Sequence, residues 1–258
     1  MGARVTRRFR ADPPRHGWLA IFLLCSSAVP VLSQQAPVTA DVEITKRQTN
    51  SEHGAGRKIA DAANVAVWLV PIDSTPSTSV DAIPQKPIPQ LVQRKKTFEP
   101  HVLIVRVGTL VQFPNRDPFF HNIFSLFDGK RFDLGLYEAG SSRAVRFDRL
   151  GVSYLFCNIH PEMSAVVVAV ATPYFGLSDR SGHVTIDSVP DGRYEMQVWY
   201  ERSRQVDLNA LAEEVNISAG VRSLGLLHVV EDPGFTAAHK DKYGRDYVPP
   251  PNSGYLEH

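Results

Sequence analysis

Residues 152–170 read VSYLFCNIHPEMSAVVVAV. Both ends of this stretch are rich in β-branched and aromatic residues, which predicts two neighbouring strands. The segment between them, CNIHPEM (157–163), is short and contains a proline, so it predicts a tight loop. Cys157, His160 and Met163 stand three residues apart in that loop. The pattern therefore predicts a thiol, an imidazole and a thioether close together at one end of a β-sheet.

The rest of the chain repeats this pattern of short strands bounded by Gly, Pro, Asn and Asp, which is typical of β-sandwiches. Helical periodicity is limited to LNALAEEV (208–215), about two turns long. We therefore predict an all-β fold. The other predicted strands are 41–47, 64–72, 101–107, 109–113, 142–147, 183–186, 193–200 and 224–230.

The first thirty-three residues predict a secretory signal, because arginines precede an apolar run from Trp18 to Leu32 that ends near Ser33. The run is shorter than the ~20 residues that span a bilayer. We expect export to the periplasm or beyond, with membrane attachment only if the signal stays uncleaved. Removing the signal leaves 28 − 5 = 23 basic and 27 − 1 = 26 acidic side chains, about −3 in net charge, which implies no nucleic-acid partner.

Cys157 is the single cysteine of the expected mature chain, because Cys25 lies within the signal. In an oxidising compartment it can remain a free thiol, bridge to another molecule or bind a metal. Taken one at a time, the three side chains of the loop also fit a core thiol, a turn-capping histidine and a core methionine. A second histidine, His121, lies in FPNRDPFFHNIFS (113–125), after a predicted strand. Their joint occurrence favours a metal site.

Two imidazoles and one thiolate with a weak axial thioether form the ligand set of a type 1 copper site. His121, Cys157, His160 and Met163 supply this set, and we predict one type 1 copper per chain. The soft sulfur ligands disfavour magnesium, calcium and manganese. Zinc could occupy the His2Cys set, but a methionine gives zinc little.

The spacing C-x2-H-x2-M, together with the preceding F-x-N-x-D-x3-H that ends at His121, resembles the plastocyanin-like cupredoxins of the amicyanin type. The resemblance covers roughly residues 90 to 171. It implies a Greek-key sandwich that holds copper in nearly the same geometry in both oxidation states. It also implies that the side chain of Asn122 ties the two ligand loops together and that a backbone amide near Asn158 hydrogen-bonds the sulfur.

One departure from this family concerns the strand that enters the cysteine. Alternate positions before the cysteine usually carry aromatic residues, whereas Ser153 and Leu155 occupy them in this chain and Tyr154 and Phe156 fall between. The departure concerns the packing of the core and not the ligands.

A second motif occupies residues 172–200, where S/T-D-x-x-G is followed by alternating apolar residues and V-P-x-G-x-Y. It resembles the carboxypeptidase regulatory-like β-sandwich, whose preceding strand pair is found here at residues 41–72. We infer that the cupredoxin sandwich is inserted in this second small sandwich, or lies adjacent to it with residues 41–72 as a separate arm. The predicted divisions are a signal peptide (1–33), N-terminal strands of the regulatory-like sandwich (39–74), a proline-rich linker (75–94), the cupredoxin domain (95–171), the remainder of the regulatory-like sandwich (172–231) and an extended or disordered tail (232–258).

These features predict an exported blue copper protein that carries single electrons, is monomeric and is not an enzyme. The resemblance implies a methylamine-utilisation-like protein with a cytochrome c or a periplasmic dehydrogenase as redox partner. Two alternatives remain: a copper-binding or delivery protein without electron transfer, and a ligand-binding or adhesion sandwich with an incidental metal site. Copper oxidases and nitrite reductases need H-x-H or H-C-H pairs for a second centre, and the sequence has none.

Overall fold

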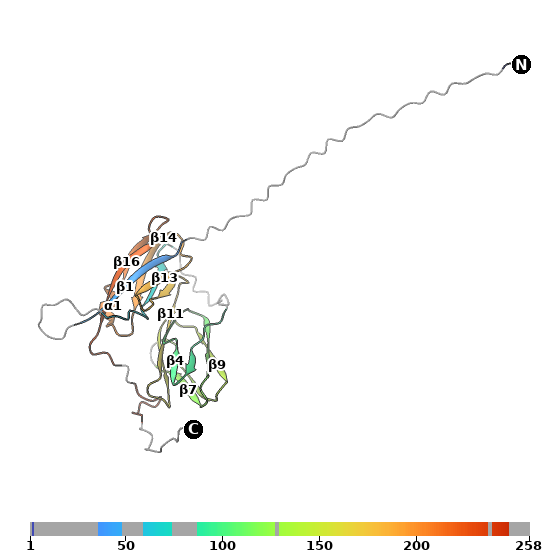
Figure 1. The fold of residues 1–258 in the computed structure, drawn as a ribbon, viewed down its shortest axis with the longest axis vertical. Coiled ribbons are helices and arrows are strands. Elements are labelled where there is room, and N and C mark those ends of the chain that lie inside the picture. Colours follow the sequence, from blue (N-terminus) through green and yellow to red (C-terminus); the bar gives the residue numbers. More distant parts are fainter. Residues whose placement is uncertain are drawn as a thin grey trace. The chain divides into compact units, whose positions relative to one another are not determined.

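The chain divides into two units, residues 1–33 and residues 34–258, and every element described below belongs to the second (Figure 1). Apart from Gly2, the predicted signal peptide lies outside the described residues, as does most of the predicted linker. No helix among the described residues has the length and apolar character needed to cross a bilayer. The computed structural model describes Gly2 and residues 36–47, 59–73, 87–126, 129–236 and 239–247.

Within these residues the structure consists of sixteen strands and one short helix, so the predicted all-β class is confirmed. The central part forms a cupredoxin-like sandwich. Its larger sheet has the strand order β5-β11-β10-β7-β8 and packs against the strand pairs β6–β9 and β3–β4 around one core. The strands are β3 (Val92–Arg94), β4 (Thr97–Glu99), β5 (Val102–Arg106), β6 (Thr109–Pro114), β7 (His121–Ser125), β8 (Phe132–Tyr137), β9 (Ser142–Phe147), β10 (Gly151–Cys157) and β11 (Ser164–Val170).

A second, smaller sandwich combines strands from both sides of the cupredoxin-like segment. Its sheets have the orders β13-β1-β16 and β12-β2-β14-β15, so β1 and β2 pair only with strands that follow the central segment (Figure 1). The cupredoxin-like sandwich is thus inserted between β2 and β12. The elements are β1 (Val38–Lys46), β2 (Ala66–Pro71), β12 (Phe175–Leu177), β13 (His183–Ile186), β14 (Gly192–Trp199), α1 (Gln205–Asn209), β15 (Glu213–Ile217) and β16 (Ser223–Glu231).

Strand β11 is buried on both faces because it lies between the two cores. Val166 and Val168 pack into the core of the second sandwich, whereas Ala165 and Val167 pack into the core of the cupredoxin-like sandwich. Neighbouring side chains of a strand point to opposite faces. The continuous apolar run of β11, without polar alternation, is the sequence of a strand with two covered faces.

The same arrangement explains the shifted aromatic residues of β10. Leu155 faces the cupredoxin-like core, whereas Tyr154 packs against the core of the second sandwich. The ring of Tyr154 meets that of Trp199 on β14 edge-on, with centroids 6.5 Å apart. Tyr154 therefore serves the junction between the sandwiches rather than the interior of the cupredoxin-like one.

The second sequence motif forms the turn before β13. Asp179 Oδ1 accepts hydrogen bonds from the N–H groups of Ser181 and His183, and Gly182 has a φ of 91°. A Cβ at this glycine would lie 2.2 Å from the carbonyl oxygen of Val42 on β1. Glycine is therefore required both by the left-handed backbone and by the close approach of β1.

Two segments differ from the sequence expectations. The predicted helix 208–215 is wrong: α1 ends at Asn209, and residues 213–217 form β15, which pairs with β14. Sheet pairing there outweighs a weak helical preference. The predicted linker 75–94 contains β3, and Leu91 is fully buried in the cupredoxin-like core. The cupredoxin-like sandwich thus includes residues before 95, because this short alternating segment pairs with β4.

A histidine–carboxylate pair predicts a pH dependence of stability. Glu201 lies 2.6 Å from the imidazole of His101 and raises the pKa of His101 above its usual value of 6.5, although burial opposes the shift. A raised folded-state pKa stabilises the fold fully below pH 6.5 and loses that contribution as the pH rises through the folded pKa. Because 38% of the His101 side chain is exposed, we expect the pair to contribute less than about 1 kcal/mol to the free energy of unfolding.

The measurement compares urea unfolding of the wild type and His101→Gln at about pH 5 and about pH 8.5. The destabilisation by His101→Gln should be larger at the lower pH. His183→Gln, which removes a more exposed contact with Asp41, is the control and should change stability little at either pH. Equal destabilisation by His101→Gln at both pH values would contradict the prediction.

Candidate metal centre

Three potential ligands converge at one end of the cupredoxin-like sandwich. His121 begins β7, Cys157 ends β10, and His160 lies in the loop between β10 and β11. Cys157 Sγ lies 3.7 Å from His121 Nδ1 and 3.5 Å from His160 Nδ1. All three donor atoms lie within 4.8 Å of one another. The antiparallel pairing of β10 with β7, Cys157 opposite Ile123, places the cysteine beside the first histidine.

The ligand loop, residues 157–163, is closed by its own backbone. The N–H of Cys157 donates to the carbonyl of Met163 at 3.2 Å, and the N–H of Met163 donates to the carbonyl of His160 at 3.1 Å. Met163 is fully buried in the same hydrophobic cluster as Cys157. The four residues selected from the sequence therefore lie in one small region, three with converging donor atoms and the methionine buried next to them.

Burial governs the protonation of the two loop ligands. It raises the pKa of the Cys157 thiol, and nearby backbone N–H groups of Asn122, Ile159 and His160 act in the opposite direction. Burial also lowers the pKa of His160, and the neighbouring His121 adds to this effect. The site therefore favours a neutral thiol and a neutral imidazole, until a cation compensates the negative charge of a thiolate.

The donor set fits copper. Two imidazole nitrogens and one sulfur, buried and close enough to share one ion, are the planar ligands of a type 1 site. Only soft or borderline metals suit such a set, and a neighbouring methionine suits copper better than zinc. The imidazoles of His121 and His160 face the sulfur through Nδ1, which leaves their Nε2 atoms for other partners.

Asp117 binds the outer nitrogen of His121. Its Oδ2 lies 2.9 Å from His121 Nε2, and both side chains are buried. Burial alone would raise the pKa of Asp117. The pKa is lowered instead, because the carboxylate accepts hydrogen bonds from the backbone N–H of Lys96, from the imidazole of His121 and from the backbone N–H of Lys95. A carboxylate on the outer nitrogen fixes the ring and leaves Nδ1 free to bind a metal. Asp117 belongs to the F-x-N-x-D-x3-H motif of the sequence. Its position four residues before His121 is the feature of the sequence that indicates this role.

Phe119 covers both imidazoles. Its ring centroid lies 5.2 Å from that of His121 and 5.5 Å from that of His160, and the two imidazole centroids are 4.9 Å apart. Lys96 Nζ lies 5.7 Å from the centroid of the same phenylalanine. Sequence reasoning did not identify Phe119, because an aromatic residue in a loop carries no distinctive spacing.

Both asparagines expected around the site lie next to it. The N–H of Asn158 donates to the carbonyl of Asn122 at 3.3 Å, which joins the two ligand-bearing segments through the backbone. The side chain of Asn122 instead donates to Asp133 at 2.7 Å. The backbone N–H groups that favour the thiolate and so lower the pKa of Cys157 belong to Asn122, Ile159 and His160. The link between the loops that the resemblance implies thus uses the carbonyl of Asn122, not its side chain.

Two other histidines bind carboxylates away from the candidate site, and a third lies close to it. His101 binds Glu201, and His183 binds Asp41. His239 stacks on Phe156, with centroids 4.0 Å apart, and so lies beside the residue that precedes the cysteine ligand. Nothing in its sequence context indicated this position, because the contact joins residues far apart in the chain.

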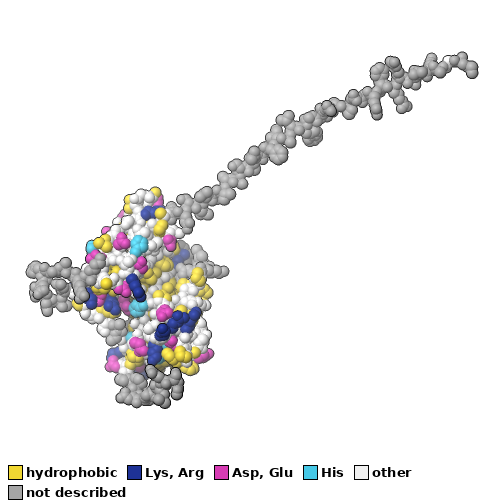
Figure 2. All heavy atoms as spheres, in the orientation of Figure 1, with side chains coloured by type: hydrophobic (Ala, Val, Ile, Leu, Met, Phe, Trp, Pro, Cys, Tyr) yellow, Lys and Arg dark blue, Asp and Glu magenta, His cyan; other side chains and the backbone are white. Residues whose placement is uncertain are grey.

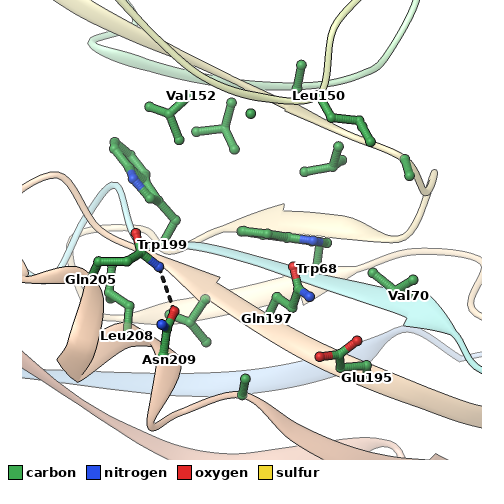
Figure 3. Close-up of a pocket in the computed structure, with 17 residues that line it drawn as sticks. Trp68, Val70, Leu150, Val152, Glu195, Gln197, Trp199, Gln205, Leu208 and Asn209 are labelled. Atoms are coloured by element: carbon green, nitrogen blue, oxygen red, sulfur yellow. Dashed lines mark hydrogen bonds between the residues drawn. The ribbon is translucent and has the colours of Figure 1, made fainter. Parts of the chain in front are cut away.

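A cavity of about 610 Å³ lies between the sandwiches, at the opposite end of β10 from Cys157. Trp68 on β2 and Trp199 on β14 extend into it and face Leu150 and Val152 across the space (Figure 3). The polar groups at its border are the amides of Gln197, Gln205 and Asn209 and the carboxylate of Glu195. The wall of the cavity is thus mainly apolar, with the polar groups at its border.

The chain matches no protein-family model and no curated protein. Solved structures do match parts of it. A purple cupredoxin from Nitrosopumilus maritimus is 26% identical, covers 32% of this chain and 99% of its own, and has a TM-score of 0.30. A reduced amicyanin variant is 20% identical, with coverages of 40% and 98% and a TM-score of 0.31.

A copper-containing nitrite reductase from Thermus scotoductus SA-01 also matches, with 24% identity and a TM-score of 0.31. The match covers 33% of this chain and 23% of the reductase, so the chain spans less than a quarter of that enzyme. All three similarities are confined to a part of the chain.

Asp117→Asn should weaken copper binding. The substitution keeps a side-chain oxygen near His121 Nε2 but removes the charge that holds the ring. Loss of such a partner typically costs about 10- to 100-fold in metal affinity. Competition with a copper chelator measures the change. The control is Asp187→Asn, the same change at an exposed turn of the second sandwich, which should leave the affinity unaltered. Equal affinities for both variants would contradict the role of Asp117.

Proposed function

We propose that this protein is an exported type 1 copper protein that carries single electrons between redox partners, with one copper per chain. The observation that carries the proposal is the convergence of His121 Nδ1, Cys157 Sγ and His160 Nδ1 within 4.8 Å. Copper bound by this set supplies a one-electron couple. The partly matching cupredoxins agree with this class of function but cover only about a third to two fifths of the chain.

The residues of the site would bind the ion and keep its surroundings rigid and dry. Cys157 is fully buried and would release its thiol proton on binding. The backbone N–H groups near its sulfur would stabilise the resulting thiolate. Asp117 would hold His121 with Nδ1 directed at the ion. Because these contacts exist in the protein itself, the ligands need little movement between oxidation states.

His160 is the ligand nearest the surface, since it is half-buried whereas His121 and Cys157 are fully buried. Apolar side chains surround this end of the sandwich: Ile159 is 44% and Phe120 is 54% exposed. We propose that a cytochrome c or a periplasmic dehydrogenase docks here through a small contact, below about 1,200 Å² in total. On the face drawn in Figure 2, charges of both signs are interspersed, which suits such a partner better than a nucleic acid.

The second sandwich is proposed to be a carboxypeptidase regulatory-like module without peptidase activity. Its motif residues have structural roles: Ser178 Oγ donates to the carbonyl of Ala62 and accepts from the N–H of Val65, and Tyr194 Oη donates to the carbonyl of Pro190. The bonds of Ser178 fasten the segment before β2 to the C-terminal part of the sandwich, whereas the bond of Tyr194 closes a local turn. A single site that exchanges one electron with its partners requires no catalysed reaction, so we propose no enzymatic activity for this protein.

Ligand binding by the second sandwich is the other candidate function. The cavity lined by Trp68 and Trp199 favours it (Figure 3). Copper delivery without electron transfer is the remaining alternative, but delivery sites are usually open or rich in methionine, and this chain has three methionines in all. A ligand in the cavity would not compete with copper, because the two regions lie at opposite ends of β10.

Substitutions in the ligand set test the proposal directly. Copper-loaded wild type should show the intense visible thiolate-to-copper band, and Cys157→Ser should abolish it because no thiolate remains. Met163→Leu should retain the band and the copper but raise the midpoint potential, since a weak donor is replaced by none. Absorption, electron resonance and a redox titration measure these changes. A colourless Cu(II) adduct of the wild type would refute the assignment.

Charge at the proposed docking surface should slow electron transfer without altering the site. Ile159→Lys places an ammonium group beside His160, and we expect the transfer rate to the native partner to fall several-fold while the spectrum and midpoint stay unchanged. Ile72→Lys, at a similarly exposed isoleucine of the second sandwich, is the matched control. Equal rates for both variants and the wild type would place the entry of electrons elsewhere.

A further inference from the structure

The segment 239–247, called the strap below, lies against the ligand loop. Tyr247 Oη donates a 2.7 Å hydrogen bond to the carbonyl oxygen of Cys157. The backbone N–H of Lys242 donates a 3.0 Å bond to Asn158 Oδ1. These partners stand 90 and 84 positions apart in the chain. Two consecutive residues of the ligand loop are thus held by a segment from outside the cupredoxin-like sandwich.

Aromatic rings extend this contact along β10. The ring of His239 stacks on Phe156, with centroids 4.0 Å apart and planes 25° apart. Tyr247 meets His239 edge-on at 5.3 Å, and its Oη lies 3.3 Å from His239 Nδ1. Phe156 directly precedes the cysteine ligand. The strap therefore covers the aromatic side chain next to Cys157 as well as binding its carbonyl.

Lys242 also connects the two segments that carry the ligands. Its Nζ lies 2.8 Å from Asp133 Oδ2, and Asp133 Oδ1 accepts a 2.7 Å bond from Asn122 Nδ2. Asn158 completes this hydrogen-bond network. Its N–H donates to the carbonyl of Asn122, and its side chain accepts from the Lys242 backbone N–H. Asn122 and Asn158 each follow a ligand directly in the sequence. One lysine of the strap thus joins both ligand-bearing segments from the outside.

The strap has a defined local structure. Asp241 Oδ1 accepts 2.8 Å bonds from the N–H groups of Tyr243 and Arg245, and the Asp241 N–H donates to the carbonyl of Arg245 at 2.9 Å. The guanidinium of Arg245 lies 3.0 Å from the same carboxylate. A turn folded around Asp241 therefore presents Lys242 and Tyr247 in fixed positions.

We propose that the strap fixes the geometry of the metal centre, with Tyr247 and Lys242 as positioning residues. The inference deepens the proposed function and rests on it. The loop closes on itself through only two backbone bonds, from Cys157 to Met163 and from Met163 to His160. Its outward polar groups, the Cys157 carbonyl and the Asn158 side chain, are bound by the strap. Without these bonds the carbonyl and the amide would hydrogen-bond water instead, and the position of the sulfur would be less restrained.

The first test uses metal-free protein lacking residues 1–33. Tyr247→Phe removes one hydroxyl and keeps the ring, and amide hydrogen exchange across residues 157–163 should become about 3- to 10-fold faster. Tyr174→Phe is the matched control: the same hydroxyl is removed from a tyrosine of the second sandwich, whose ring packs against Tyr194 and not against the strap. Exchange in this control should equal that of the wild type.

The second test uses copper. Lys242→Met breaks the bond to Asp133, and we expect copper affinity to fall about tenfold, with a shifted midpoint potential. Lys242→Arg keeps a cation for Asp133 and should restore most of the affinity. Lys240→Met is the control, because Lys240 pairs at 3.6 Å with Asp246, an exposed residue of the strap itself.

The outcomes separate this inference from the proposed function. If the Tyr247 and Tyr174 variants exchange alike and the Lys242 and Lys240 variants bind copper alike, the strap does not position the ligands and the inference is overturned. If the wild type binds no copper, the proposed function fails. In that case the exchange experiment still decides whether the strap restrains the loop.

Discussion

The burial of β11 on both faces is the constraint on which the rest of the structure depends. One set of alternate side chains completes the cupredoxin-like core and the other completes the core of the second sandwich. A shift of one residue in its pairing would exchange these sets, so the register with β5 and β10 is fixed from both sides. Since β11 begins directly after Met163, this register also fixes where the ligand loop ends.

The side chains of the candidate metal centre are restrained from three directions in the protein itself. The β10–β11 hairpin sets Cys157, the carboxylate of Asp117 sets the ring of His121, and the strap binds the outside of the ligand loop. Each restraint comes from a different part of the chain. Rigid ligands keep the energy of rearrangement small when charge changes, and they also bias the site towards ions that accept its geometry.

The sequence allowed the all-β class and the convergence of His121, Cys157 and His160 to be predicted, because ligands on one loop and one strand end leave a spacing that local reasoning can read. Contacts between distant segments leave no such spacing. The stacking of His239 on Phe156 and the bond from Tyr247 to Cys157 depend on how the chain returns to the site. The same holds for the strand at residues 213–217, because pairing with β14, and not local preference, determines its conformation.

The insertion of one sandwich in the other has a consequence for the order of folding. β1 and β2 leave the ribosome first, but every strand with which they pair follows Val170. The inner sandwich can close while these two apolar strands still lack neighbours. Contacts so distant in sequence form slowly, and unpaired edges attract other chains in the meantime. The pairing of β1 and β2 therefore has to wait until the strands after Val170 have been synthesised.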